Sequence, residues 1–177
     1  MQFVYPNKPV RVYDVPSIIS KLSGWIVQPK YDGRRVLIAC ENNQITLYGR
    51  LYQKFKELRP WLSNLPLPQP FLIDGELLRN GNIYIWDYAI LGGEHEYRKP
   101  YIERWNKIKD LKPMEVNGNK FAVVDSLPAE RYAELLDGSK PDHLAIEGCV
   151  LKSPAATDLW GIYSTAEVAS MVKYRIR

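Results

Sequence analysis

The sequence predicts an α+β fold made mostly of antiparallel sheets flanked by helices, and three observations support this prediction. Short apolar and β-branched runs, separated by turn residues, recur along the 177 residues. The segment Arg-Asn-Gly-Asn at 79–82 lies between two such runs and is a strong hairpin signal. Only three segments have features of a helix. A chain of this length fits one compact domain, and we expect residues 1–177 to form it.

We expect strands in the order in which the apolar runs occur. Three consecutive antiparallel strands are predicted over 24–29, 35–40 and 44–50, joined by a Tyr-Asp-Gly turn and by Glu-Asn-Asn. The runs 71–78 and 83–90 form the hairpin around Arg-Asn-Gly-Asn. Further strands are expected over 120–126, 143–152 and 167–177.

The three expected helices differ in how clearly they are marked. Residues 52–62 have helical apolar spacing, although Pro60 complicates the end of that segment. Residues 101–111 place apolar side chains on one helical face. Residues 128–138 begin with proline and end with glycine, as a short helix commonly does.

Composition excludes several classes of protein. No apolar run approaches the roughly 18 residues that a membrane helix needs, and the N-terminus lacks the apolar stretch of a secretory signal. We therefore expect a cytoplasmic protein without a membrane partner. The net charge of +4 suits a nucleic-acid partner but does not establish one.

The cysteines and histidines limit the kind of metal site. Cys40 and Cys149 each lie inside an apolar run, so we expect buried thiols and no disulfide. Besides them the chain has only His95 and His143, which are too few for a Cys/His metal site. Any metal would be a hard cation, Mg²⁺ or Mn²⁺, held by carboxylates and phosphate.

Ionisable residues occur in several strands where alternation predicts apolar ones. They are Lys30, Asp74, Glu76, Glu147, Lys152, Lys173, Arg175 and Arg177. Asp74 and Glu76 share one face of their strand because side chains alternate with a period of two. Each residue alone has an ordinary explanation, such as a solvated turn lysine at Lys30. Charges in apolar strands are costly unless paired, however, so together they are expected to converge on a site.

The order of these residues resembles a known family. "KYDGRR" at 30–35 looks like the nucleotide-attachment motif KxDGxR, and the later motifs follow in order as "LYGR", "FLIDGELL", "IWDYAI", "YIERW", "AIEGCVLK" and "MVKYRIR". Together they resemble the adenylation (nucleotidyltransferase) domain of ATP-dependent DNA ligases, an ATP-grasp-like domain whose superfamily includes mRNA capping enzymes. The resemblance runs from about residue 25 to the C-terminus.

The resemblance implies that Lys30 attacks the α-phosphate of ATP and becomes a lysine–AMP phosphoramidate. An ammonium has no free lone pair, and at a reference pKa near 10.4 only about one lysine in 2,500 is neutral at pH 7. Partial burial and the cations Arg35 and Lys173 would lower the pKa of Lys30. The crowded cations would therefore activate Lys30 while they hold phosphate.

The resemblance also assigns the other site residues. Glu76 and Glu147 match acidic positions that meet the ribose or the divalent metal, and with Lys30 and Lys173 they form the expected catalytic set. Trp86 matches the aromatic position that stacks on adenine, although it could also be an ordinary core tryptophan. The remaining nucleotide-binding positions are Gln28, Arg35, Arg50, Lys152 and Arg175.

The implied substrate is nicked duplex DNA. AMP passes to the 5′-phosphate at the nick, and the adjacent 3′-hydroxyl then displaces it, while the protein supplies positioning and charge stabilisation. Such ligases usually continue into an OB-fold domain that orients pyrophosphate, whereas this chain stops at "KYRIR". We therefore expect no OB-fold domain in this chain, a monomer, and room for a separate OB-fold or clamp-supplying partner.

Two departures from the family pattern leave two alternatives open. Arg175 stands where many relatives carry a lysine, and residues 153–170 lack the arginine common between the last two motifs. An RNA ligase or mRNA-capping-type nucleotidyltransferase is the first alternative, because no residue here identifies a 2′-hydroxyl. The second is a non-catalytic nucleotide- or nucleic-acid-binding module. The presence of Lys30, Glu76, Glu147 and Lys173 argues against it.

Overall fold

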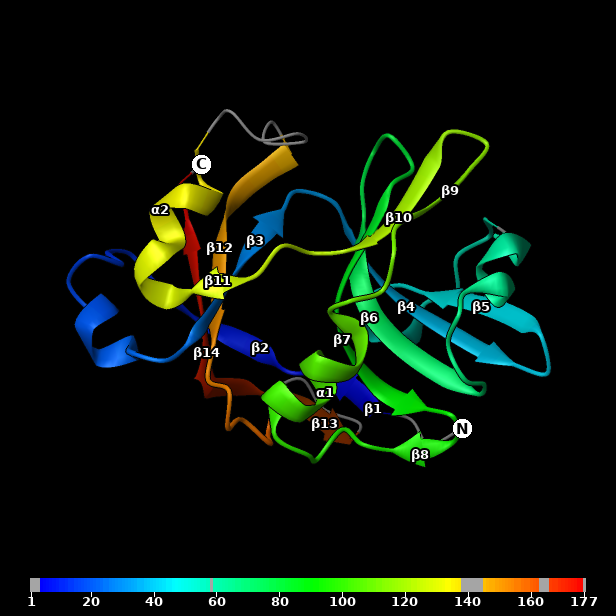
Figure 1. Ribbon diagram of the computed structural model, residues 1–177, viewed down its shortest axis with the longest axis horizontal. Coiled ribbons are helices and arrows are strands. Elements are labelled where there is room, and N and C mark those ends of the chain that lie inside the picture. The colour runs from blue at the N-terminus through cyan, green and yellow to red at the C-terminus, as the bar shows by residue number, and fades with distance from the viewer. Residues whose placement is uncertain (1–3, 58, 138–144, 163–165, 177) are drawn as a thin grey trace. The chain divides into compact units, whose positions relative to one another are not determined.

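The computed structural model describes residues 4–57, 59–137, 145–162 and 166–176. Within them the chain forms three β-sheets and a few short helices, which confirms the predicted α+β class (Figure 1). No OB-fold domain occurs among the described residues. None of the described helices is long and apolar enough to cross a membrane.

The chain divides into two compact units. The first consists of residues 1–32, 100–102 and 124–177, and the second of residues 33–99 and 103–123. The chain therefore passes four times from one unit to the other, and the first passage lies between Asp32 and Gly33, inside the "KYDGRR" motif.

The first unit contains a five-stranded sheet and a two-stranded sheet. The larger sheet has the order β11–β3–β12–β14–β2, and β1 pairs with β13 in the smaller one. The strands are β1 Val4–Pro6, β2 Lys8–Val12, β3 Ile26–Tyr31, β11 Leu127–Pro128, β12 Ile146–Lys152, β13 Trp160–Ile162 and β14 Glu167–Arg175. The helices are η1 Ile19–Leu22, η4 Ala129–Arg131 and α2 Tyr132–Leu135. Their apolar side chains pack with those of β3, β12 and β14 into one core, so one face of the larger sheet is apolar.

The second unit is organised around a seven-stranded sheet. Its order is β5–β4–β6–β7–β10–β9, and β8 pairs with β7. The strands are β4 Arg34–Glu41, β5 Gln44–Tyr48, β6 Phe71–Leu77, β7 Ile83–Leu91, β8 Glu94–His95, β9 Met114–Val116 and β10 Asn119–Val123. The 3₁₀ helices are η2 Arg50–Tyr52 and η3 Pro60–Asn64, and most of α1 (Tyr101–Ile108) also belongs to this unit. Strand β6 is buried along its whole length, which makes it the centre of the unit.

Two predicted hairpins are confirmed. Strands β4 and β5 pair antiparallel around Asn42 and Asn43, whose φ angles of 51° and 60° suit the left-handed turn of a two-residue hairpin. Strands β6 and β7 also pair antiparallel. Their turn includes Gly81 at φ 90°, a conformation that glycine adopts readily.

Most other sequence-based elements are confirmed as well. The expected strands near the middle and the end of the chain are β10, β12 and β14, and the helices expected at 101–111 and 128–138 are α1 and the pair η4–α2. Cys40 and Cys149 are buried free thiols, and burial raises the pKa of Cys149 to about 12. Arg177, which was placed on a face with Lys173, lies outside the described residues.

The predicted hairpin between the first two strands is wrong. Strand β3 pairs with β11 and β12, whereas β4 pairs with β5 and β6. The Asp32 amide donates to the Ala145 carbonyl at 2.6 Å, so the chain continues along β12 before it leaves the first unit. The Asp-Gly signal therefore marks a crossover between two sheets and not a hairpin turn.

The predicted helix over 52–62 is also wrong. After η2 the chain turns back on β5, where the Phe55 amide donates to the Leu47 carbonyl at 2.9 Å. Helical structure appears only from Pro60, as the short η3. Proline has no amide hydrogen and cannot continue a preceding helix, so the apolar spacing was misleading here.

Candidate active site

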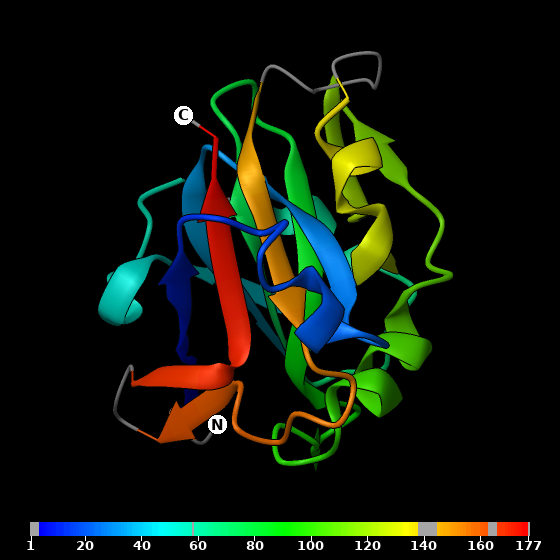
Figure 2. The ribbon, with the colours of Figure 1, turned by 90° about the vertical axis from the view of Figure 1, so that its left-hand side faces the viewer.

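Polar side chains of the first unit line up on one face of its five-stranded sheet. Val27, Cys149 and Val172 point into the core, so alternation along β3, β12 and β14 directs their neighbours to the opposite face. Figure 2 shows β12 between β3 and β14 in this sheet. The neighbours on the opposite face are Gln28, Lys30, Lys152, Lys173 and Arg175.

Lys30, Glu147 and Arg175 form an ion-pair cluster on this sheet. Lys30 Nζ donates to Glu147 Oε1, and Arg175 Nη2 lies 3.2 Å from the same oxygen. The side chains of Lys30 and Glu147 are only 20% and 14% exposed. Glu147 therefore supplies a negative charge between the two closely spaced cations, Lys30 and Arg175. Because one carboxylate faces two cations, the cluster keeps a positive charge that favours an anionic ligand.

Gly148 allows β12 and β14 to approach closely at this cluster. It lies opposite Lys30 on β3 and opposite Arg175 on β14. A Cβ at this position would lie 1.9 Å from the Tyr174 carbonyl oxygen, so only glycine fits. The pairing of β12 with β3 shifts register just before Gly148. Such a bulge redirects a side chain, and here it brings Glu147 to the face that carries Lys30.

Lys173 has a lowered pKa. Burial lowers it first, and the nearby cations Arg175, Arg11 and Lys8 lower it further, while Glu167 opposes the shift. Both effects favour the neutral amine. The lowered pKa belongs to a residue of the expected catalytic set.

Sequence reasoning missed Arg11. Strand β2 pairs in parallel with β14, and this register places Arg11 opposite Lys173. The exposed Arg11 guanidinium lies 4.8 Å from the centroid of the Tyr13 ring, and a cation–π contact of this kind holds the charge in place. No signal in the sequence could have found Arg11, because β2 and β14 lie at opposite ends of the chain.

Gln28 and Lys152 are buried on the same face. Gln28 Nε2 donates to Ser126 Oγ at 3.0 Å, but its buried Oε1 has no hydrogen-bond partner among the described residues. An unpaired buried acceptor costs about 1–3 kcal/mol, so a donor from a ligand would be favoured there. The Lys152 ammonium lies 4.6 Å from the centroid of the Tyr101 ring.

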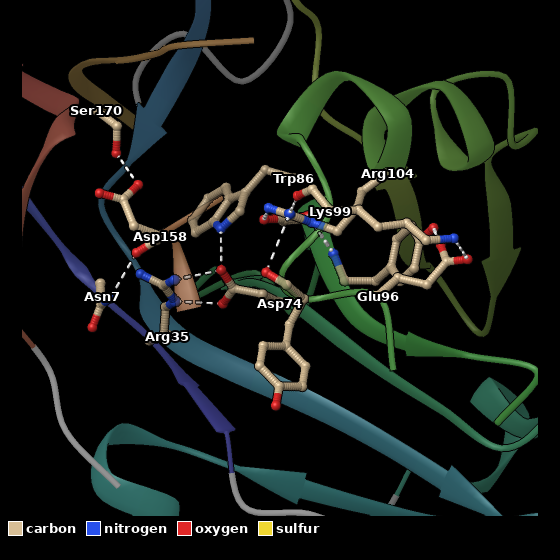
Figure 3. Close-up of polar contacts among 12 residues, drawn as sticks. Asn7, Arg35, Asp74, Trp86, Glu96, Lys99, Arg104, Asp158 and Ser170 are labelled. Carbon is tan, nitrogen blue, oxygen red and sulfur yellow. Dashed lines mark hydrogen bonds and ion pairs between the residues drawn. The ribbon is translucent and has the colours of Figure 1, made fainter. Parts of the chain in front are cut away.

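Asp74 organises the candidate site residues of the second unit. This buried carboxylate accepts two hydrogen bonds from the Arg35 guanidinium and one of 2.6 Å from Trp86 Nε1 (Figure 3). The guanidinium also lies 5.4 Å from the centroid of the Trp86 ring. Sequence reasoning gave Asp74 no role in binding, although its position on one strand face with Glu76 was a signal. The structure shows that Asp74 fixes both Arg35 and Trp86.

Glu76 and Arg50 occupy different parts of the second unit. Glu76 is buried on β6, directly opposite Arg35 in the pairing with β4. Arg50 is exposed at the start of η2, beyond the end of β5, and β5 lies two strands from β6 in the sheet. The structure therefore groups Arg35, Glu76 and Trp86, and it leaves Arg50 at the edge of the unit.

The carboxylates suit a hard cation only in combination with a phosphate ligand. The described part of the chain contains no group of three His, Cys, Asp or Glu side chains that could hold a metal ion. Mg²⁺ commonly binds one or two carboxylates and completes its shell with water and substrate phosphates. Glu76 and Glu147, each taken by itself, are compatible with this mode.

Comparison with solved structures identifies the fold. The ligase domain of LigD from M. tuberculosis matches with a TM-score of 0.67 and 18% identity, over 96% of this chain and 59% of that one. This is the fold of a DNA ligase adenylation domain. Lig E DNA ligase matches with a TM-score of 0.61 and 19% identity, over 98% and 69% of the two chains. The ATP-dependent DNA ligase of bacteriophage T7, solved with ATP, matches with a TM-score of 0.56 and 14% identity, over 96% and 68%.

The similarity to DNA ligases lies in the fold. No family model and no curated protein sequence matches the chain. The chain spans about three-fifths of the length of the LigD ligase domain.

Proposed function

We propose that residues 1–177 form the nucleotidyltransferase (adenylation) domain of an ATP-dependent DNA ligase. The Lys30–Glu147–Arg175 cluster carries this proposal, together with Lys173 on the same sheet face. The cluster combines an amine nucleophile, a proton acceptor and cations that bind phosphate. Transfer of a nucleotide to a lysine requires these three groups.

The first step joins Lys30 to AMP. Glu147 accepts one proton from the Lys30 ammonium, to which it is hydrogen-bonded. The neutral amine then attacks the α-phosphorus of ATP, a nitrogen–phosphorus bond forms, and pyrophosphate departs with the electrons of its bond and with the second proton. Arg175 and Lys173 stabilise the charge on the phosphates. AMP then passes to the 5′-phosphate of a nick, and the 3′-hydroxyl displaces it.

The remaining site residues bind the nucleotide. Gln28 Oε1 would accept a hydrogen bond from the exocyclic amine of adenine, whereas guanine carries a carbonyl at that position. Trp86, held by Asp74, offers its ring to the base. The ribose and the phosphates are assigned to Arg35, Arg50, Glu76 and Lys152. Glu76 and Glu147 would hold Mg²⁺ or Mn²⁺, which when bound neutralises charge on the phosphates.

Nicked duplex DNA is the proposed partner, and the chain is proposed to act as a monomer in the cytoplasm. The chain carries a net charge of +4, which suits an electrostatic contribution to DNA binding. A separate OB-fold or clamp-supplying protein is compatible with this proposal.

Incubation of the protein with Mg²⁺ and α-labelled ATP or GTP tests the proposed function. We expect acid-labile label on the protein from ATP and none from GTP. Label from GTP would favour capping-type chemistry, and faster sealing of RNA-containing nicks than of DNA nicks would favour an RNA ligase. Folded protein that takes label from neither nucleotide would contradict the proposal.

Replacing Arg11 tests whether this residue, which lies on the same sheet face as Lys173 and Arg175, binds the terminal phosphates of ATP. Because Arg11 lies opposite Lys173 on an edge strand, Arg11→Ala should raise KM for ATP in self-adenylation about tenfold, as expected for loss of one charge-assisted hydrogen bond. kcat should change little, and Arg11→Lys should recover most of the affinity. Sealing of a pre-adenylated nick, which lacks these phosphates, should be unaffected, as should both reactions in Lys21→Ala. Equal losses in the two reactions would show that Arg11 does not bind the leaving group.

A further inference from the structure

The segment that follows β5 in the second unit has an unusual backbone. Leu51 and Tyr52 have positive φ angles of 55° and 61°, a backbone region that is strained for a residue other than glycine. The Tyr52 ring packs edge-to-face on Tyr48, with centroids 5.4 Å apart. The Leu51 side chain, by contrast, is 70% exposed. Packing within the protein explains the conformation of Tyr52 but not the presentation of a leucine to solvent.

Besides Arg50, three cations accompany this segment, and two of them contact aromatic rings. The Arg34 guanidinium is 4.9 Å from the centroid of the Phe55 ring, and the Lys54 ammonium is 6.0 Å from that of Tyr48. Lys56 is exposed on the same segment. Cation–π contacts hold charged groups at defined places on a surface without neutralising them.

The charge of this region is only partly compensated. Glu57 is the acidic residue of the segment, and Arg59 already donates two hydrogen bonds to it. Arg34 lies 4.0 Å from Glu57 and remains two-thirds exposed. Within the described residues, neither Lys54 nor Lys56 forms an ion pair. The surface therefore keeps a positive charge around an exposed apolar side chain.

We propose that Arg34, Leu51, Lys54 and Lys56, here called the β5 surface, bind the sugar–phosphate backbone of duplex DNA beside the nick. This inference rests on the proposed function and adds the place where the substrate is held. Phosphates attract the three cations, and an exposed leucine suits the sugars and base edges of the minor groove, where apolar side chains are commonly inserted. The strained backbone is then explained by the contact that Leu51 makes with DNA.

The double variant Lys54→Ala/Lys56→Ala tests the electrostatic part. We expect it to bind nicked DNA about tenfold more weakly, and the slope of log affinity against log salt concentration to fall by about 2, because each phosphate contact contributes nearly one to that slope. Lys109→Ala/Lys112→Ala removes the same charge from exposed positions elsewhere in the second unit and should leave the slope unchanged. Equal slopes for the two double variants would overturn the proposal.

Leu51→Gly tests the apolar part and separates it from folding. Glycine adopts positive φ without strain, so this variant should unfold at the same temperature as the wild type or at a higher one. Its affinity for nicked DNA should nevertheless fall severalfold. Unchanged affinity would show that Leu51 does not contact DNA.

Self-adenylation distinguishes a failure of this inference from a failure of the proposed function, because it needs no DNA. If all variants take label and their DNA binding is unchanged, only the proposed DNA-binding role of the β5 surface is overturned. If the wild type takes no label but its DNA binding still depends on Lys54 and Lys56, the proposed function is overturned. The DNA-binding role of the β5 surface is then still supported.

Discussion

Replacing Lys30 by alanine is expected to reduce transfer of AMP to the protein about 10³-fold or more, because no other group can take the place of a lost covalent nucleophile. The measurement is acid-labile label from α-labelled ATP after a fixed time with Mg²⁺. The structure supports this expectation because the Lys30 amine is partly buried and paired with the Glu147 carboxylate, which Arg175 also contacts.

Lys30→Arg is the matched control for folding. A guanidinium keeps the ion pair with Glu147 but is not a nucleophile, so the variant should lose the label and retain a thermal midpoint close to that of the wild type. Both variants should still seal a pre-adenylated nick, since that step does not use the Lys30 amine. Label that persists in Lys30→Ala would place the nucleophile elsewhere.

Replacing Arg104 by methionine is expected to destabilise the second unit by about 3–5 kcal/mol, the usual cost of leaving a buried charge unpaired. Arg104 is fully buried in α1 and donates two hydrogen bonds, of 2.9 and 2.8 Å, to Asp87 on β7. It also donates to the carbonyl of Lys99. The free energy of unfolding from a denaturant titration measures the effect.

A surface ion pair of the same type provides the control. Arg131 donates two hydrogen bonds of 2.6 Å to Glu134, but both side chains are half exposed, so Arg131→Ala should leave the unfolding midpoint unchanged within error. The double variant Arg104→Met/Asp87→Leu should recover part of the lost stability because it removes the stranded charge. A loss below about 1 kcal/mol in Arg104→Met would contradict burial as the cause.

Much of the fold could be predicted because hairpin and alternation signals are local. Asn42 and Asn43 specify their own turn, and the alternation in β14 places Lys173 and Arg175 on one face whatever lies next to that strand. The Asp-Gly turn after Tyr31 was misread, because the same residues serve a crossover as readily as a hairpin. The helix expected over 52–62 failed because η3 begins only at Pro60 and the preceding residues return to β5.

The sequence by itself determined which chemical groups the chain contains and, along a regular strand such as β14, which face they share, since side-chain alternation is a property of each strand alone. Glu147 lies on the face of Lys30 only because of the register shift before Gly148, which alternation does not predict. Only the tertiary structure decided which carboxylate neutralises which cation: Glu147 pairs with Lys30, and Asp74 pairs with Arg35. Only the tertiary structure placed Arg11 opposite Lys173. The physical reason is that pairing between distant strands is set by the free energy of burying a common core, which no short segment of sequence contains.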